Sequence, residues 1–374
     1  MILAQQTQLV CTVCQRVYAA DEPVWRCTCG GLLDIKIQLK IDLAAVEKRK
    51  PSMWRYREAL PLDTDQHIVS FDEGFTPLLP LSFSGREILF KLDMLFPSGS
   101  YKDRGASLLI SKAKELGIQR VVEDSSGNAG AAMATYCARA GMACDIYVPE
   151  STSLGKLEQI AATGAHLHKI PGTRQDTAEA VLDAAQHTYY ASHSWNPFFF
   201  HGTKTCAYEL CEQMGWQTPD SIVVPVGNGT LLLGLHIGFE ELFQAGIISS
   251  KPQFIAVQAA ACAPLAQRFL GEAFDNASGE TLAEGIAIAN PIRGEQILRA
   301  VQNSRGTFVA VEELEILDAW KQLAQMGLYV EPTAAATVAG LTQVQNRGTL
   351  TGAVVVILTG HGLKSAGKSL AYAT

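Results

Sequence analysis

The 374-residue chain lacks the features that mark an exported or membrane-spanning protein. Its first residues, Met1 to Gln5, contain neither a basic region nor a long apolar segment, so we expect no signal peptide. The longest apolar runs, such as Ala353–Leu358, are too short to cross a bilayer. The sequence therefore predicts a cytoplasmic protein without a membrane partner.

An excess of positive charge and a disulfide framework are also missing. The chain carries 30 lysines and arginines against 37 aspartates and glutamates, a net charge of -7, which argues against nucleic acid as a partner. Its nine cysteines are odd in number and mostly scattered, as in proteins of a reducing compartment.

What the chain has is a globular composition, with 48% apolar and 18% charged residues, and a regular alternation of strand and helix patterns. Alternation of this kind predicts an α/β fold with two doubly wound α/β domains and a ligand cleft between them. We expect an N-terminal segment over residues 1–35 and a small mobile domain over 85–192. A large domain is expected to combine 36–84 with 193–374. The predicted strands include 88–92, 121–123, 144–148, 166–170, 188–192, 221–225, 254–258 and 353–358, and the predicted helices include 106–116, 129–140, 154–162, 175–185, 202–214, 231–245, 312–326 and 333–344.

Four cysteines form two close pairs near the N-terminus, Cys11 with Cys14 and Cys27 with Cys29. Two such pairs on a short hairpin are typical of a zinc ribbon, in which four thiolates hold a structural metal ion. The second pair has one intervening residue instead of two. The alternative is a ribbon that has lost its metal and keeps only the hairpin.

Lys102 stands where a loop becomes a helix. Pro97, Ser98, Gly99 and Ser100 predict a tight turn, and an apolar helical pattern follows up to Gly117. A lysine in this position is a candidate nucleophile. The alternative is a solvated surface lysine paired with Asp103.

Three further loops follow predicted strands and could hold a ligand. The first, Ser125 to Asn128, offers an anion site at a helix N-terminus, although ordinary helix capping would use the same residues. The second, from Val226, has two glycines that let backbone N–H groups approach a phosphate. The third ends a strand with Thr359, whose hydroxyl could reach a ligand or could bond only local backbone. A lysine, an asparagine, a glycine-rich loop and a strand-end threonine together suit pyridoxal 5'-phosphate.

The order and the residues of these motifs resemble those of the threonine synthase family, among the fold-type II pyridoxal-phosphate enzymes. The resemblance implies that Lys102 is the Schiff-base lysine and general base, that Asn128 bonds the ring hydroxyl and that Thr359 meets the pyridine nitrogen. It implies that Ser125, Ser126 and Gly127 bind the substrate carboxylate, and that the cofactor phosphate lies on Gly227, Asn228, Gly229, Thr230 and Leu231. The matching motifs are Glu73 to Leu78, Pro97 to Gly105, Ser125 to Asn128, Gly202 to Thr205, Gly227 to Thr230 and Leu358 to Lys364.

One segment departs from that family. Where threonine synthases usually offer Asn, Ser and Arg to the phosphate of O-phosphohomoserine, this chain has His193, Ser194 and Phe199. Loss of the arginine favours a smaller or less charged substrate. The expectation is a lyase that makes threonine from O-phosphohomoserine, with a threonine or serine dehydratase as the alternative and a catalytically silent cofactor-binding protein as a third reading. The resemblance also suggests a homodimer.

Overall fold

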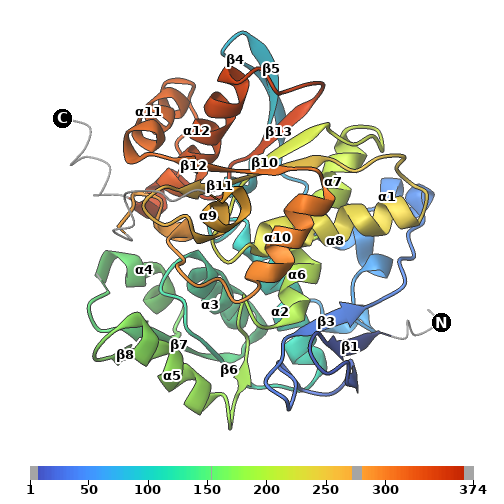
Figure 1. Ribbon diagram of the computed structural model, residues 1–374. Coiled ribbons are helices and arrows are strands. Elements are labelled where there is room, and N and C mark those ends of the chain that lie inside the picture. Colours follow the sequence, from blue (N-terminus) through green and yellow to red (C-terminus); the bar gives the residue numbers. More distant parts are fainter. Residues whose placement is uncertain (1–6, 153, 272–279, 366–374) are drawn as a thin grey trace. The chain divides into compact units, whose positions relative to one another are not determined.

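The computed structural model describes residues 7–152, 154–271 and 280–365 (Figure 1). The chain forms two units, and it passes between them three times. Unit 1 contains Met1–Gly74 and Lys102–Thr205, and unit 2 contains Phe75–Tyr101 and Cys206–Thr374.

Unit 1 is built on a four-stranded parallel sheet in the order β8-β7-β6-β9. Parallel strands need long crossover connections, and helices supply them here. Val122 of β6, for example, lies opposite Asp145 of β7 on one side and Tyr190 of β9 on the other. The elements are β6 (Arg120–Glu123), α3 (Asn128–Ala140), β7 (Ala143–Pro149), α4 (Leu154–Ala162), β8 (His166–Ile170), α5 (Arg174–Ala184) and β9 (Tyr189–Tyr190).

The N-terminal part of unit 1 is a separate three-stranded antiparallel sheet in the order β2-β1-β3. Its central strand runs from Gln8 to Cys11 and pairs with both neighbours. The elements are β1 (Gln8–Cys11), β2 (Val17–Ala19), β3 (Leu33–Lys36), the short helix α1 (Leu43–Lys48) and the 3-10 helices η1 (Met53–Ala59) and η2 (Asp65–His67).

Two helices of unit 1 differ from those that the sequence pattern predicts. Helix α2 (Lys102–Glu115) starts at Lys102 itself, so the lysine lies in the first helical turn. The aromatic run after Asn196 is helix α6 (Pro197–Thr203), separate from the predicted helix 202–214. The Asn196 side chain accepts a bond from Phe198 N at 3.2 Å, and Pro197 occupies the first turn, a combination that starts a helix in spite of three bulky phenylalanines.

Unit 2 contains a six-stranded sheet in the order β12-β11-β10-β13-β5-β4, parallel except for the edge strand β4. Two of its strands, β4 and β12, do not appear among the predicted strands, and β4 contains Pro80, which is unfavourable in a strand. The strands are β4 (Leu78–Phe83), β5 (Arg86–Lys91), β10 (Ser221–Pro225), β11 (Gln253–Ala259), β12 (Thr307–Val311) and β13 (Val354–Ile357). The helices are η3 (Asp93–Leu95), α7 (Thr205–Gln213, whose first residue belongs to unit 1), α8 (Thr230–Gln244), α9 (Pro264–Leu270), η4 (Glu284–Ile286), α10 (Gly294–Asn303), α11 (Glu313–Gln325), α12 (Pro332–Asn346) and η5 (Gly362–Ser365).

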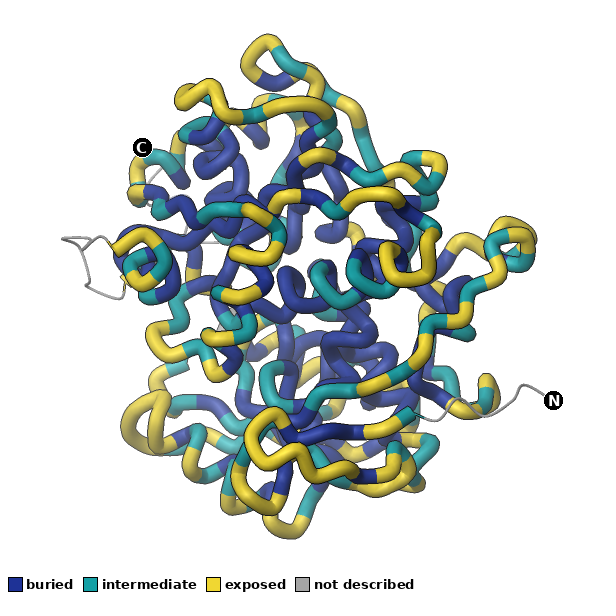
Figure 2. The backbone as a smooth tube through the Cα atoms, turned by 45° about the vertical axis from the view of Figure 1, so that its right-hand side comes forward, coloured by how far each residue is buried: buried dark blue, intermediate teal, exposed yellow. Residues whose placement is uncertain are grey.

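The core of unit 2 lies between this sheet and the alanine-rich helix α12. Strands β10 and β13 are buried along their whole length, as expected for parallel strands covered on both faces. Close packing depends on a small residue, since a Cβ on Gly340 of α12 would lie 2.5 Å from Val257 Cγ2 of β11. Figure 2 shows the buried residues following the inner helices and strands, with exposed residues at the loops.

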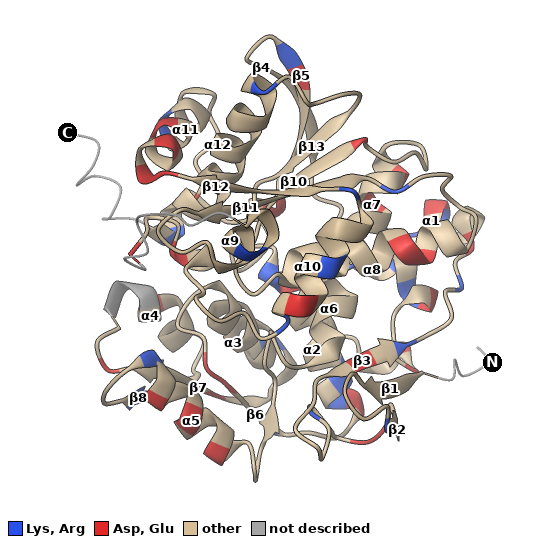
Figure 3. Ribbon diagram, viewed as in Figure 1, with Lys and Arg blue, Asp and Glu red and all other residues tan. Residues whose placement is uncertain are grey.

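Charges of both signs are interspersed over the elements, in keeping with the small net charge (Figure 3). Within the described ranges, no helix has the length and apolar character needed to cross a membrane.

Candidate functional site

The first group of predicted site residues belongs to unit 1, around the start of helix α2. Lys102 is half-buried there, and its Nζ lies 5.7 Å from the centroid of the Phe199 ring in α6. Two glycines let the helices touch. A Cβ on Gly105 would lie 2.4 Å from Phe199 Cε1, and one on Gly202 would lie 2.2 Å from the Arg104 carbonyl oxygen. The glycines in these two motifs therefore bring the Phe199 ring to Lys102.

Phe199 is fully buried and lies against two other rings. Its ring meets His193 edge-on with centroids 6.1 Å apart, and Phe200 in the same way at 6.5 Å. At the position where the family resemblance predicts an arginine, the structure therefore places a ring that can offer a phosphate no hydrogen bond.

His193 forms a buried pair with a residue that the sequence analysis did not single out. Its Nδ1 lies 2.6 Å from Oε1 of Glu123, at the carboxyl end of β6. Burial, with the nearby positive charge of Lys102, lowers the pKa of His193 to about 3. Burial, with the charge of Asp124, raises the pKa of Glu123 well above its usual range. Both shifts favour the uncharged forms of the two groups, and with a pKa of about 3 His193 does not supply the positive charge that the missing arginine would have given.

The loop Ser125 to Asn128 joins strand β6 to helix α3 as predicted, with Asn128 as the first helical residue. Ser125 Oγ accepts a bond from Gly127 N at 3.3 Å, which tightens the turn. Gly130 is required by the same turn, since its Cβ would lie 1.8 Å from the Ser125 carbonyl oxygen. Ser194 lies on a different loop, with its Oγ 3.3 Å from that of Ser192.

The second group of predicted residues belongs to unit 2 and meets at Tyr101. The Tyr101 hydroxyl lies 2.8 Å from Thr230 Oγ1, and its backbone N donates to the Thr359 carbonyl at 3.0 Å. The turn before it is fixed in the same way, because His361 N donates to the Gly99 carbonyl at 2.9 Å. Tyr101 is the residue directly before Lys102. The glycine-rich loop and the strand-end threonine are therefore each one hydrogen bond away from the residue that precedes the lysine.

Two hydroxyls beside Tyr101 are buried and lack a hydrogen-bond partner in the part of the chain that the structure describes. They are Thr359 Oγ1 and Ser100 Oγ. Buried polar atoms normally have a partner, and exceptions often mark a place that a ligand or a water completes. Thr359 Oγ1 thus fits the expected bond to a pyridine nitrogen.

The glycine-rich loop leads into helix α8, whose N-cap is Gly229. Gly229 has a φ of 68°, in the left-handed region, and Gly227 has no room for a side chain, since its Cβ would lie 2.9 Å from Ile286 Cα. The N-terminus of a 15-residue helix attracts an anion through its backbone N–H groups and its dipole. The loop therefore fits the phosphate of pyridoxal phosphate without a lysine or arginine.

Sequence reasoning missed Glu123 and Tyr101. Both had a usable signal. Glu123 ends a strand of a parallel sheet, where ligands of α/β folds bind, and Tyr101 is the polar neighbour of the proposed nucleophile.

Comparison with known proteins identifies the family of the chain. Residues 69–360 match the family described as pyridoxal-phosphate dependent enzyme. The chain is 37% identical over 372 residues to a threonine synthase of Methanocaldococcus jannaschii, covering 95% of this chain and 92% of that protein. It is 35% identical over 373 residues to a threonine synthase of Methanosarcina acetivorans, with the same two shares. Among solved structures, serine racemase from Dictyostelium discoideum matches with a TM-score of 0.62 and 26% identity, over 77% of this chain and 92% of that one.

Proposed function

This chain belongs to the family of pyridoxal-phosphate dependent enzymes, and from that membership we propose that it acts as a threonine synthase. It would convert O-phospho-L-homoserine and water into L-threonine and phosphate. The relatives that carry this name match over almost the whole chain. The observation in the fold that supports it best is the junction at Tyr101, which ties Thr230 and Thr359 to the residue before Lys102.

Each residue of the site would have one task. Lys102 would hold the cofactor covalently and, once released by the substrate amine, would take the proton from the substrate's α-carbon. Gly227 to Leu231 would hold the cofactor phosphate. Asn128 would bond the ring hydroxyl, and Thr359 would bond the ring nitrogen. When bound, pyridoxal phosphate supplies an electron-withdrawing ring that stabilises negative charge at the α-carbon.

Other residues would act on the substrate itself. Ser125, Ser126 and Gly127, at the start of α3, would bind its carboxylate. Because Thr359 is neutral, it would not keep the ring nitrogen protonated as a carboxylate would, and this favours elimination over transamination. His193 and Ser194 would face the end of the substrate that carries the leaving group. We further propose that the enzyme is a cytoplasmic homodimer.

The uncharged His193 and the buried Phe199 ring favour one second candidate, a threonine or serine dehydratase. A phosphate dianion bound beside His193 and Phe199 would lack the charge-assisted hydrogen bond to an arginine, which contributes about 1.5–3 kcal/mol. A dehydratase acting on threonine or serine needs no such bond, because its leaving group is a hydroxyl.

Two assays on the purified holoenzyme separate the candidates. With O-phospho-L-homoserine, a threonine synthase releases phosphate and threonine in equal amounts. With L-threonine, a dehydratase forms 2-oxobutyrate and ammonia. Formation of 2-oxobutyrate without any phosphate release from O-phospho-L-homoserine would overturn the synthase proposal.

The Lys102→Ala variant tests the assignment of the lysine in the same assays. We expect the visible absorbance of the lysine-bound cofactor to disappear and turnover to fall by about 10²–10⁴-fold or more, since the variant lacks the general base. Lys114→Ala, an exposed position on the same helix, is the matched control and should behave as the wild type. Retention of the absorbance in Lys102→Ala would contradict the assignment.

A further inference from the structure

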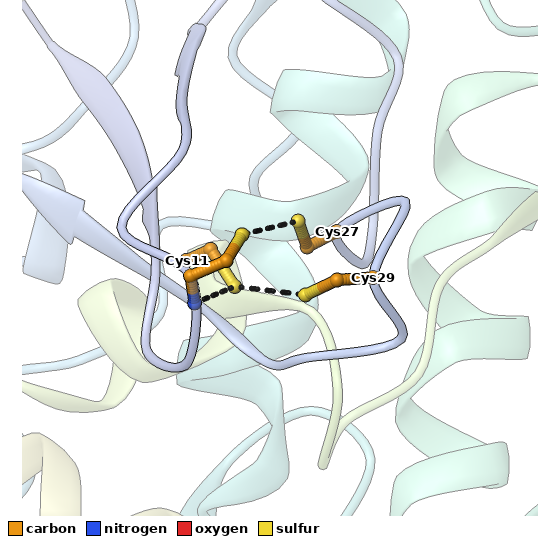
Figure 4. Close-up of side chains that lie close together, drawn as sticks. Cys11, Cys27 and Cys29 are labelled. Carbon is orange, nitrogen blue, oxygen red and sulfur yellow. Dashed lines mark hydrogen bonds between the residues drawn. The ribbon is translucent and has the colours of Figure 1, made fainter.

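The four N-terminal cysteines come together in the three-stranded sheet of unit 1. Cys11 ends β1 and Cys14 follows in the next turn, while Cys27 and Cys29 lie in the loop before β3. The sulfur atoms of Cys11 and Cys29 are 3.5 Å apart, as are those of Cys14 and Cys27. Figure 4 shows the labelled side chains pointing toward one another. Two separate loops therefore present their thiols to one point.

The size of the cluster suits a single tetrahedral ion. All four sulfurs lie within 4.8 Å of one another. Four sulfurs that are each about 2.3 Å from a central zinc ion would lie roughly 3.8 Å apart. The observed separations bracket that value, so an ion can be bound with small side-chain adjustments and no movement of the backbone.

Neighbouring groups already hold the sulfurs in place. The backbone N–H groups of Val13 and Cys14 point at Cys11 Sγ, at 3.4 Å and 3.5 Å. The Tyr18 hydroxyl donates to Cys27 Sγ at 3.1 Å. Gly31 has no room for a side chain, since its Cβ would lie 2.8 Å from Cys11 Sγ. Donors aimed at sulfur are the usual second layer of a thiolate metal site, where they stabilise the negative charge.

We propose that Cys11, Cys14, Cys27 and Cys29 bind one structural zinc ion. Four thiolates fill a tetrahedral zinc site and leave no open position for water or substrate, so the ion has no catalytic role. Zinc has no redox chemistry, which suits a site where Cys14 and Cys29 are exposed to solvent. The single residue between Cys27 and Cys29 does not prevent binding, because the turn at Gly30 and Gly31 brings the second thiol to the cluster.

The site also supports the segment that we assign to the substrate. Trp25, two residues before Cys27, packs edge-on against Tyr190 at 5.0 Å and against Trp195 at 5.6 Å between ring centroids. His193 lies between these two residues in the sequence. The zinc ion would fix the loop that carries Trp25 and thereby position His193. This second part of the inference depends on the proposed function, whereas the metal site does not.

Metal content of the full-length holoenzyme tests the site directly. Protein purified under reducing conditions without chelators should contain one zinc ion per chain, as measured by inductively coupled plasma mass spectrometry. Replacing zinc by cobalt should give the visible bands of a tetrahedral cobalt–thiolate site. The variant Cys14→Ser/Cys29→Ser changes two exposed residues and should lose both signals, whereas Cys144→Ser, a buried cysteine of β7, should keep them.

A graded variant keeps all four ligands. Tyr18→Phe removes only the donor to Cys27, and we expect zinc affinity to fall about 10–100-fold, as for other residues next to metal ligands. Folded wild-type protein that takes up neither zinc nor cobalt with all four thiols reduced would overturn the proposal. Iron in place of zinc, or disulfides linking the four cysteines, would overturn it as well.

A kinetic comparison tests the link to His193. Loss of zinc in Cys14→Ser/Cys29→Ser should shift the tryptophan fluorescence as Trp25 loosens, and should raise the KM for the substrate more than it lowers kcat. The cofactor absorbance should remain, because the variant leaves Lys102 untouched. Zinc loss with unchanged fluorescence and unchanged KM would keep the metal site and reject its positioning role. Zinc binding by a protein without threonine synthase activity would reject the proposed function alone.

Discussion

Two regions of this protein are expected to face a phosphate group, and they differ in chemistry. The loop from Gly227 to Leu231 consists of small residues at the N-terminus of α8, and it can bind an anion through backbone N–H groups. The segment from His193 to Phe199 contains a neutral histidine and a buried phenyl ring. The first is suited to the phosphate of the cofactor. The second lacks the charge that the phosphate of the expected substrate would need.

The difference shows that recognition of the two phosphates depends on different features of the sequence. Backbone recognition needs glycines and a helix start, and a single side-chain change elsewhere does not remove it. Recognition by an arginine depends on one residue, and the change to Phe199 removes it. The cofactor is therefore set by the fold, whereas the substrate is set by a few side chains in unit 1.

Among the variants that test the difference between the two phosphate regions, Gly229→Ala is expected to have the largest effect. An alanine at a φ of 68° is strained by about 1–2 kcal/mol, and its Cβ would lie 2.3 Å from Ile297 Cδ1. The loop must shift, so we expect the affinity for pyridoxal phosphate to fall on the order of 10–100-fold, which corresponds to about 1.4–2.8 kcal/mol. Titration of the apoprotein with the cofactor measures it.

The matched control for this variant is Gly246→Ala. Gly246 has the same φ of 68° but nothing within 4 Å of its Cβ position. It should lose stability by a similar amount and keep the cofactor affinity of the wild type. Equal loss of affinity in both variants would mean that the loop at Gly229 does not hold the cofactor.

A smaller effect is expected from restoring the arginine with Phe199→Arg. The new guanidinium can form a charge-assisted hydrogen bond, so the KM for O-phospho-L-homoserine should fall by about tenfold. The protein should lose about 1–3 kcal/mol of stability, because the ring fills the space over Gly105. Steady-state kinetics and thermal unfolding measure the two effects.

Phe199→Leu is the control, since it changes the shape of the same site without adding charge. It should give no improvement in KM. If arginine and leucine have the same effect on O-phospho-L-homoserine, the segment does not face the leaving group, and the contrast between the two phosphate regions would be rejected.

Much of the fold and the cofactor could be predicted from the sequence. The glycine-rich loop, the loop at Ser125 and the strand-end Thr359 each follow a strand, and a strand followed by a helix is visible in the hydrophobic pattern. Helix α6 could not be predicted, because three successive phenylalanines have weak helix propensity and the Asn196 cap outweighs it. The link from Tyr101 to Thr230 spans 129 positions, so no local pattern contains it. The same holds for the pair of Glu123 with His193.

Thr359→Val is expected to have a still smaller effect, and it tests the cofactor side again. The variant replaces a buried hydroxyl that has no partner among the described residues, so the stability of the apoprotein should be unchanged or slightly higher. The lost bond to the cofactor should lower affinity or kcat several-fold, about 0.5–1.5 kcal/mol. Thr337→Val, whose hydroxyl is equally buried and equally unpaired in the described structure, should leave the cofactor unaffected.

A pH dependence of stability is expected from the Glu123–His193 pair. We expect the folded pair to hold one proton, because the pKa of Glu123 is raised and that of His193 is lowered. Between about pH 4.5 and 6.5 the unfolded chain also holds one proton on these two groups, since its glutamate is ionised and its histidine is protonated. The pair therefore contributes no pH dependence to the free energy of unfolding in that window. Below it the unfolded chain binds the extra proton, and above it the folded protein does, so stability falls on both sides by about 1.4 kcal/mol per pH unit.

Each single variant should instead slope across this window, in opposite directions. In Glu123→Gln only His193 remains, and since its pKa is lowered by folding, its contribution is lost as the pH falls below 6.5. In His193→Gln only Glu123 remains, and since its pKa is raised, its contribution is lost as the pH rises above 4.5.

His201→Gln is the control, because His201 is a buried neutral histidine whose Nδ1 has no partner in the described residues. Replacing His201 should reduce the loss of stability at acidic pH and leave the stability at higher pH unchanged. Denaturant unfolding of the holoenzyme variants across this pH range measures the profiles. The contribution of the pair is the difference in free energy of unfolding between the wild type and the double Gln variant. If this difference changes between pH 4.5 and 6.5, the number of protons on the folded pair is not constantly one. The folded pair would then carry a net charge in part of that pH range.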